Sequence, residues 1–166
     1  MLVVSKLNIG SIYLAIDDYK NSEEWISKAL NCAKDINDPN LTEKCYLNLG
    51  IVYKKKGDTA KAIASYKKGL AISESLKNLR DQAIGLQNLA ILSQSGKKFK
   101  ETYSYLSRAL LINRELKANN SGVHTGLANL FFKEHLYDST ISHCNLAIAL
   151  AKERKTKSYT LLRKNC

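Results

Sequence analysis

Hydrophobic residues recur along the chain at spacings of three and four, which is the pattern of helices that bury one face. Within residues 41–56, for example, Tyr46, Leu49, Gly50 and Tyr53 fall on one side of such a helix. Short polar stretches rich in Gly, Asn and Asp separate these segments and indicate turns. The pattern therefore predicts an all-α protein of eight helices, near 3–17, 21–36, 41–56, 59–77, 81–96, 99–117, 121–136 and 138–155.

The helices recur in pairs, and the sequence aligns with itself when it is shifted by the length of one pair. This shift places Gly10 on Gly50 and Ala90, and Tyr13 on Tyr53. A weaker fourth copy follows after a slightly shorter step. The period of about 40 residues is typical of solenoids, in which stacked units bury a continuous core. We expect four helical hairpins within residues 1–155, over about 3–40, 41–80, 81–120 and 121–155, with 156–166 either starting a further helix or capping the array.

The second hairpin contains residues suited to a tight turn and to close helix packing. Gly57 fits the left-handed position that follows a helix, and Asp58 or Thr59 can cap the helix that begins next. Gly50 and Gly69 lack a side chain, so neighbouring helix backbones can approach them closely.

This hairpin resembles the tetratricopeptide repeat. The residues that carry the likeness are Leu49, Gly50, Tyr53, Gly57, Ala62, Tyr66 and Gly69. The likeness extends over most of the chain and is weakest in the fourth hairpin. The period exceeds the roughly 34 residues usual in the family, and it is similar to the long repeats of kinesin light chain, of spindle-orientation scaffolds and of bacterial sensor and regulator proteins. The resemblance implies a right-handed α-α superhelix whose first helices line a concave, partner-binding groove.

The same resemblance assigns residues to that groove. Asn8, Asn48 and Asn88 share one register, and each side-chain amide can pair with the backbone of a bound peptide. We call this row of amides the Asn ladder. Gly126 takes the same register in the fourth hairpin, so the ladder would end there. Alternatively, duplication of one unit merely copied a solvent-facing Asn. The wider groove positions include Leu7 and Leu47. The predicted partner-binding residues are Asn8, Asn48, Asn88, Lys44, Ile51, Lys54, Lys55, Gln87, Ile91, Gln94, Asn129 and Lys133.

The chain is basic, with a formal net charge of +11, of which +6 falls within residues 41–80. The sign alone is compatible with nucleic acid, an anionic membrane surface or an acidic protein. Lys44, Lys54 and Lys55 favour an acidic or carboxylate ligand in the groove, although lysines at a helix end also suit the helix dipole. Nucleic acid is disfavoured because the tyrosines fall on packing positions. No apolar run is long enough to predict a membrane span.

No pattern of residues indicates a catalytic or metal site. The histidines are scattered, at His124, His135 and His143. The cysteines, Cys32, Cys45, Cys144 and Cys166, lack metal-ligand spacing, and three fall on apolar helical positions typical of core residues. Free cysteines are tolerated in a reducing compartment, which favours the cytoplasm. We expect no enzyme activity and no cofactor.

Two functions of different classes follow from these features. The first is a non-enzymatic interaction module that binds a protein or peptide in its groove. The second is the regulatory, sensing region of a larger bacterial signalling protein, such as a histidine kinase or a transcription regulator. The chain starts and stops inside amphipathic patterns, which leads us to expect a piece of a longer polypeptide. Neither the partner's identity nor the oligomeric state is predicted.

Overall fold

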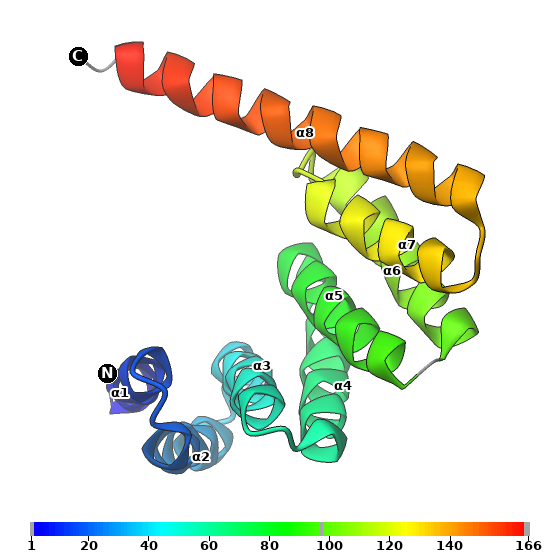
Figure 1. Cartoon of the computed structure of the whole chain (residues 1–166). Coiled ribbons are helices and arrows are strands. Elements are labelled where there is room, and N and C mark those ends of the chain that lie inside the picture. The colour runs from blue at the N-terminus through cyan, green and yellow to red at the C-terminus, as the bar shows by residue number, and fades with distance from the viewer. Residues whose placement is uncertain (1, 97, 165–166) are drawn as a thin grey trace. The chain divides into compact units, whose positions relative to one another are not determined.

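The computed structural model describes residues 2–96 and 98–164, with side chains up to Glu153. Over these residues the backbone forms eight helices and no strand (Figure 1). The prediction of an all-α protein is confirmed. The helices are α1 (Leu2–Ala15), α2 (Tyr19–Asp35), α3 (Pro39–Lys55), α4 (Thr59–Ser75), α5 (Leu79–Ser95), α6 (Phe99–Glu115), α7 (Ser121–Lys133) and α8 (Tyr137–Lys164).

The chain divides into two compact units, Met1–Leu89 and Ala90–Cys166, and α5 crosses the boundary between them. In the first unit α1 packs on α2 and α3 on α4, and α3 also contacts both α1 and α2. In the second unit α7 packs on α6 and α8. Each unit is therefore built from antiparallel helical neighbours joined by short turns.

The turns repeat one backbone geometry at regular intervals. The residues with positive φ include Asp17, Asn37, Gly57 and Lys77, which are evenly spaced along the chain, and Lys117 follows after twice that interval. A left-handed residue here closes the helix, because the next N–H can bond back to a carbonyl five residues earlier. The structural unit is thus one helix with its turn, and two such units make one period of the sequence.

Aspartates begin the helices that follow these turns. Asp18, Asp38 and Asp58 each accept the backbone N–H of the residue three positions on, at 3.1, 3.0 and 3.1 Å. Such a bond satisfies one of the free donors at a helix N-terminus and stabilises the helix by about 1 kcal/mol. The predicted roles of Gly57 and Asp58 are confirmed.

The predicted end of the eighth helix near residue 155 is wrong, because α8 continues to Lys164. The stretch after residue 155 contains no glycine or proline that would stop a helix, and the prediction rested on repeat length alone. A capping role for 156–166 stays a prediction, and Cys166 lies outside the described residues. No helix in the described part of the chain is both long and apolar enough to cross a membrane.

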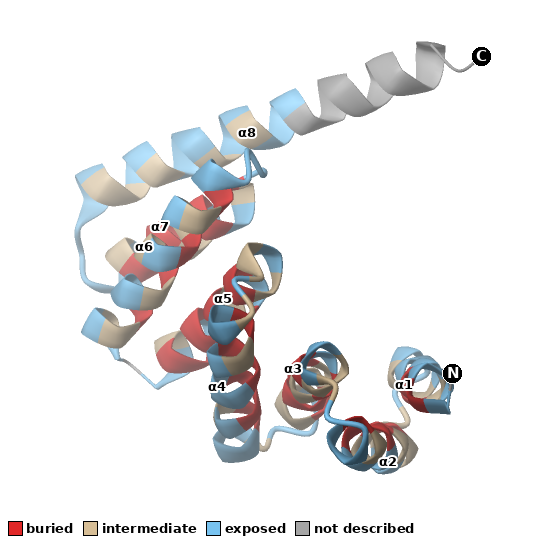
Figure 2. Ribbon diagram, turned by 180° about the vertical axis from the view of Figure 1, so that it is seen from behind, coloured by how far each residue is buried: buried red, intermediate tan, exposed pale blue. Residues whose placement is uncertain are grey.

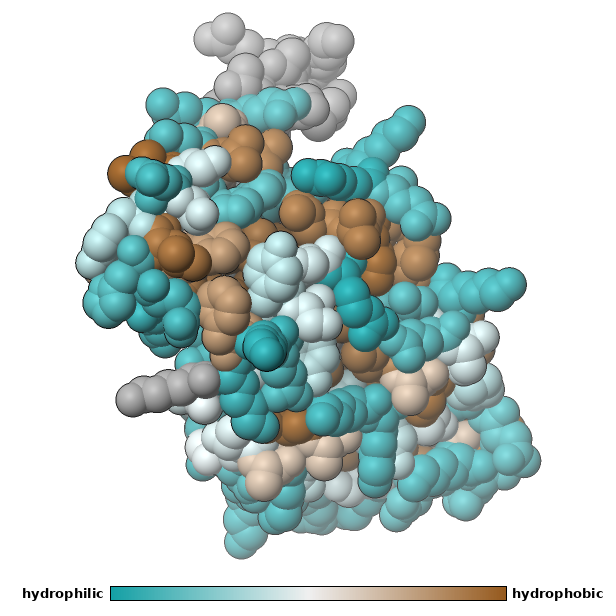
Figure 3. All heavy atoms as spheres, turned by 90° about the vertical axis from the view of Figure 1, so that its right-hand side faces the viewer, coloured by the Kyte–Doolittle hydropathy of each residue, from teal (hydrophilic) through white to brown (hydrophobic). Residues whose placement is uncertain are grey.

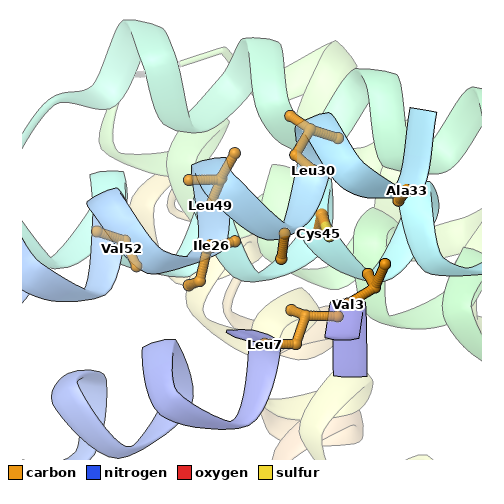
Figure 4. Packing of buried hydrophobic residues seen from close by; sticks show 9 residues of the cluster. Val3, Leu7, Ile26, Leu30, Ala33, Cys45, Leu49 and Val52 are labelled. Carbon is orange, nitrogen blue, oxygen red and sulfur yellow. The ribbon is translucent and has the colours of Figure 1, made fainter. Parts of the chain in front are cut away.

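One core cluster of the first unit lies where α1, α2 and α3 meet. Its buried side chains point toward one another (Figure 4), and buried positions follow the faces that neighbouring helices share (Figure 2). On the face of the molecule seen in Figure 3, hydrophobic areas are interspersed with hydrophilic side chains. The residues of this cluster are Val3, Leu7, Ile26, Ala29, Leu30, Ala33, Cys45, Leu49 and Val52.

Glycines permit the closest contacts between helices. A Cβ added to Gly50 would lie 2.5 Å from Cε1 of Tyr66, and one added to Gly10 would lie 2.5 Å from Cγ1 of Ile26. Both distances are far below van der Waals contact, and both partner side chains are fully buried. The predicted role of Gly50 in close packing is confirmed.

Candidate peptide-binding surface

Three helices of the first unit, α1, α3 and α5, contact one another in series. α1 packs directly on α3. Asn78, which precedes α5, donates from Nδ2 to Glu43 Oε2 on α3 at 3.3 Å and to Asp81 Oδ2 at 2.7 Å. Glu43 is fully buried, and its burial together with the nearby Asp81 charge raises the pKa of its carboxyl group. These contacts fix the start of α5 beside α3.

Asn48 on α3 and Asn88 on α5 have the same conformation. Each donates from Nδ2 to the carbonyl four residues earlier in its own helix, at 3.0 and 3.1 Å. Lys54 donates from Nζ to Asn88 Oδ1 at 2.7 Å and so bridges the two helices. Asn8, the third residue of this register, is exposed on α1. Asn48 Oδ1 and the Asn8 amide could therefore pair with a ligand, and Asn48 and Asn88 each keep a second amide N–H for it, because a side-chain amide has two.

The lysines of this surface differ in their environment. Lys54 is half-buried, and burial, followed by the adjacent Lys55 charge, lowers the pKa of its ammonium group. Lys44 and Lys55 are exposed on α3. Ile51 is half-buried beside them, so the surface combines accessible cations with an apolar side chain.

Two of the wider groove positions are wrong. Leu7 and Leu47 are only 7% and 8% exposed and belong to the core. A Cβ on Gly69 of α4 would lie 2.9 Å from Cδ2 of Leu47, which shows that Leu47 faces α4. Leu47 thus fills the space that Gly69 of the facing helix leaves.

The groove residues predicted for the second unit cluster near the C-terminal ends of α5 and α7. Ile91, Asn129 and Lys133 are exposed, and half-buried Gln94 donates from Nε2 to the Gly126 carbonyl at 3.4 Å. A cavity of about 440 Å³ brings together part of this set with residues that the sequence missed. It is lined by Gln94, Ser95, Lys98, Phe99, Thr102, Leu130, Lys133 and Glu134.

Two of the histidines are paired, contrary to the expectation that all three are scattered. His124 on α7 and His143 on α8 place their Nδ1 atoms 2.9 Å apart with their rings stacked. Burial lowers the pKa of both imidazoles, and for His124 the His143 and Arg114 charges add to this effect. Their separation in sequence gave no signal of this contact. No group of three or more potential metal ligands occurs among the residues that the structure describes.

The cysteines differ in their environment more than the sequence suggested. Cys45 is fully buried, and burial raises the pKa of its thiol to about 12. Cys32 is half-buried and its Sγ accepts a hydrogen bond from Lys6 Nζ at 3.0 Å. Cys144 is exposed on α8 and is therefore not a core residue.

Residues 2–75 match the model of the tetratricopeptide repeat family. They form tetratricopeptide repeats. The match covers α1 to α4 and includes Asn8, Asn48 and the lysines of α3. Tetratricopeptide repeats are generally non-catalytic, and their fold suggests a scaffold for protein–protein interaction.

Solved structures extend the likeness in fold beyond these residues. BtubC from P. vanneervenii has a TM-score of 0.79 and 22% identity, over 87% of this chain and 60% of that one. The apo form of RapI has a TM-score of 0.87 and 17% identity, over 95% of this chain and 58% of that one. The chain thus spans about three fifths of each of these structures. No curated protein sequence matches it.

Proposed function

We propose that the surface formed by α1, α3 and α5 of the first unit binds an extended peptide segment of a protein partner, without catalysing a reaction. The observation that carries the proposal is the common register of Asn8, Asn48 and Asn88 on three helices that contact one another in series. An amide that faces solvent can donate to one peptide carbonyl and accept from one N–H, whatever the peptide sequence.

The charge and polarity of the surface support an acidic segment. Lys44 and Lys55 are exposed on the same face of α3 as Asn48, and Ile51 lies half-buried between them. The cations favour Asp and Glu in the ligand and accelerate its association. Ile51 offers a contact for one apolar side chain.

The test starts from linear peptides selected from a random phage-displayed library on the full chain. We expect the selected peptides to be enriched in Asp and Glu. In Asn48→Ala/Asn88→Ala the affinity should fall roughly thirtyfold, because two residues each lose hydrogen bonds of about 1 kcal/mol. Fluorescence anisotropy measures the affinity, and circular dichroism should show unchanged helicity and melting.

The matched control is Asn31→Ala/Asn145→Ala, which removes one exposed amide on α2 and one on α8, both outside this surface. It should change the affinity less than twofold. N-methylation of the peptide backbone should weaken binding to the wild-type chain, since the amides contact the backbone. Equal binding by the Asn48/Asn88 double variant, with wild-type melting, would remove the ladder from the proposed function.

A further inference from the structure

A second hollow lies within the first unit, between α2 and α4, with α3 as its floor. Its volume is about 380 Å³. On α3 the floor residues Tyr46, Leu49 and Tyr53 are about half a turn from Lys44, Asn48, Ile51 and Lys55, because a helix rotates about 100° per residue. The hollow is therefore on the opposite face of α3 from the proposed peptide surface. It is lined by Ser27, Leu30, Asn31, Lys34, Tyr46, Leu49, Tyr53, Lys61, Ala64, Ser65 and Lys68.

The ammonium groups of Lys34 and Lys68 converge on one ring. They lie 5.6 and 5.5 Å from the centre of Tyr46, so both charges are held close to the same side chain. Lys34 is on α2 and Lys68 on α4. A cation close to an aromatic face is weakly attracted to it, but this contact leaves both positive charges uncompensated.

No acidic side chain is among the residues that line the hollow. Two acids close to the lining residues Tyr53 and Lys61 are engaged elsewhere. Glu23 pairs with Lys56 and accepts the hydroxyl of Tyr53, while Asp58 pairs with Lys61 Nζ at 3.2 Å and caps α4. Burial and the Glu23 carboxylate together raise the pKa of Tyr53 to about 12, so this hydroxyl remains a donor to Glu23. The excess positive charge of the hollow thus belongs to Lys34 and Lys68.

We propose that this hollow binds the phosphoryl group of a phosphoserine side chain in a protein partner. A phosphoryl group carries nearly two negative charges and three acceptor oxygens, so it can accept from both lysines and from neutral donors together. Ser27, Asn31 and Ser65 supply such donors from the walls. A carboxylate has one charge and two oxygens and would satisfy fewer of these groups.

The shape of the hollow favours a peptide over a free anion or a nucleic acid. Leu30, Leu49 and Ala64 give it an apolar part that inorganic phosphate would leave unused but that a peptide could contact. Single-stranded nucleic acid requires a basic track with aromatic faces open for stacking. Tyr46 is half-buried and its ring is next to two lysines.

The experiment uses the full chain labelled with ¹⁵N and titrated at pH 7.5 with N-acetyl-phosphoserine amide. We expect amide signals of residues 27–34, 46–53 and 61–68 to shift, with a dissociation constant on the order of millimolar, as suits a single small group. Lys34→Gln/Lys68→Gln should weaken this binding at least about tenfold, since it removes both charged partners. Lys20→Gln/Lys100→Gln, which loses the same charge at exposed sites elsewhere, should change it less than twofold.

Further titrations separate the alternatives. N-acetyl-glutamate amide and inorganic phosphate should each bind more weakly, and binding of the phosphoserine compound should weaken at pH 5, where its phosphate holds a single charge. Equal losses of affinity in the Lys34→Gln/Lys68→Gln and Lys20→Gln/Lys100→Gln variants would indicate non-specific attraction and overturn the proposal. So would absence of shifts in the wild-type chain, equal affinity for glutamate or free phosphate, or tighter pocket-dependent binding of oligothymidylate. Asn48→Ala/Asn88→Ala should leave phosphoserine binding in the hollow unchanged. The two proposals can therefore fail independently of each other.

Discussion

Replacement of Gly50 by alanine tests whether the repeat needs a bare backbone where α3 meets α4. The new Cβ would lie 2.5 Å from Cε1 and 2.6 Å from Cδ1 of Tyr66, whose ring is fully buried and so has no free space to move into. Alanine is preferred over glycine in a helix by about 1 kcal/mol. Overpacking of a core typically costs about 1–3 kcal/mol. We expect the clash to dominate, with a net loss of up to about 2 kcal/mol in the free energy of unfolding.

Gly85→Ala is the matched control, because Gly85 is also a buried residue within a helix. Its added Cβ would lie 3.6 Å from Leu70 Cβ, an ordinary contact. The helix preference should then prevail and stabilise the chain by about 0.5–1 kcal/mol. The two substitutions are chemically identical, so opposite signs would isolate the effect of the close approach.

Urea unfolding followed by far-ultraviolet circular dichroism measures both variants. A change in midpoint at constant slope reports stability alone. In a Tyr66→Ala background the Gly50→Ala substitution should lose its destabilising effect, because the ring that it strikes is absent. If Gly50→Ala instead stabilised the chain as Gly85→Ala does, the glycine would not be required by packing and the reasoning would be refuted.

Two further predictions concern the turns and the histidines. Lys77→Gly and Lys117→Gly should each raise the free energy of unfolding by about 1 kcal/mol in thermal or urea melts, because their φ values of 54° and 51° strain any side chain. Gly57→Ala, at φ 78°, should lower the free energy of unfolding for the same reason. A loss of stability in the two lysine variants would contradict this account. The pKa values of His124 and His143 are lowered in the fold, so the unfolded chain binds protons more readily and stability should be full above pH 6.5 and fall as the pH decreases below it. His143→Gln should flatten this dependence in urea melts at pH 7.5 and 5.

The helices were predictable because apolar periodicity and turn residues agree over most of the chain. All eight predicted helices occur, and the turn predicted at Gly57 and Asp58 is found between α3 and α4. The end of α8 was missed for lack of a stop signal. The sequence did not reveal that left-handed turns recur at even intervals after single helices. Lys77 and Lys117 occupy left-handed positions, which normally favour glycine or asparagine.

The candidate surfaces were less predictable, because they depend on which side chains meet between helices. The common register of Asn48 and Asn88 follows from the repeat, but the Lys54 bridge to Asn88 does not. The two lysines that converge on Tyr46 are far apart in sequence, and each alone is an ordinary surface lysine. Binding by the peptide surface, and the alternative of a sensing region in a larger signalling protein, stay predictions.

The even spacing of the turns limits how such an array can lengthen or shorten. Successive helices run in opposite directions. If one helix and its turn were lost, the next helix would run in the wrong direction against its new neighbour. If a whole hairpin were lost, the next helix would keep its direction and would bury the same face. The fourth copy illustrates the tolerated variation: α7 is shorter than α6, and the connection between them is longer than the one between α1 and α2. Lineages carrying this architecture would therefore gain or lose whole hairpins, and smaller insertions would survive chiefly in the connections.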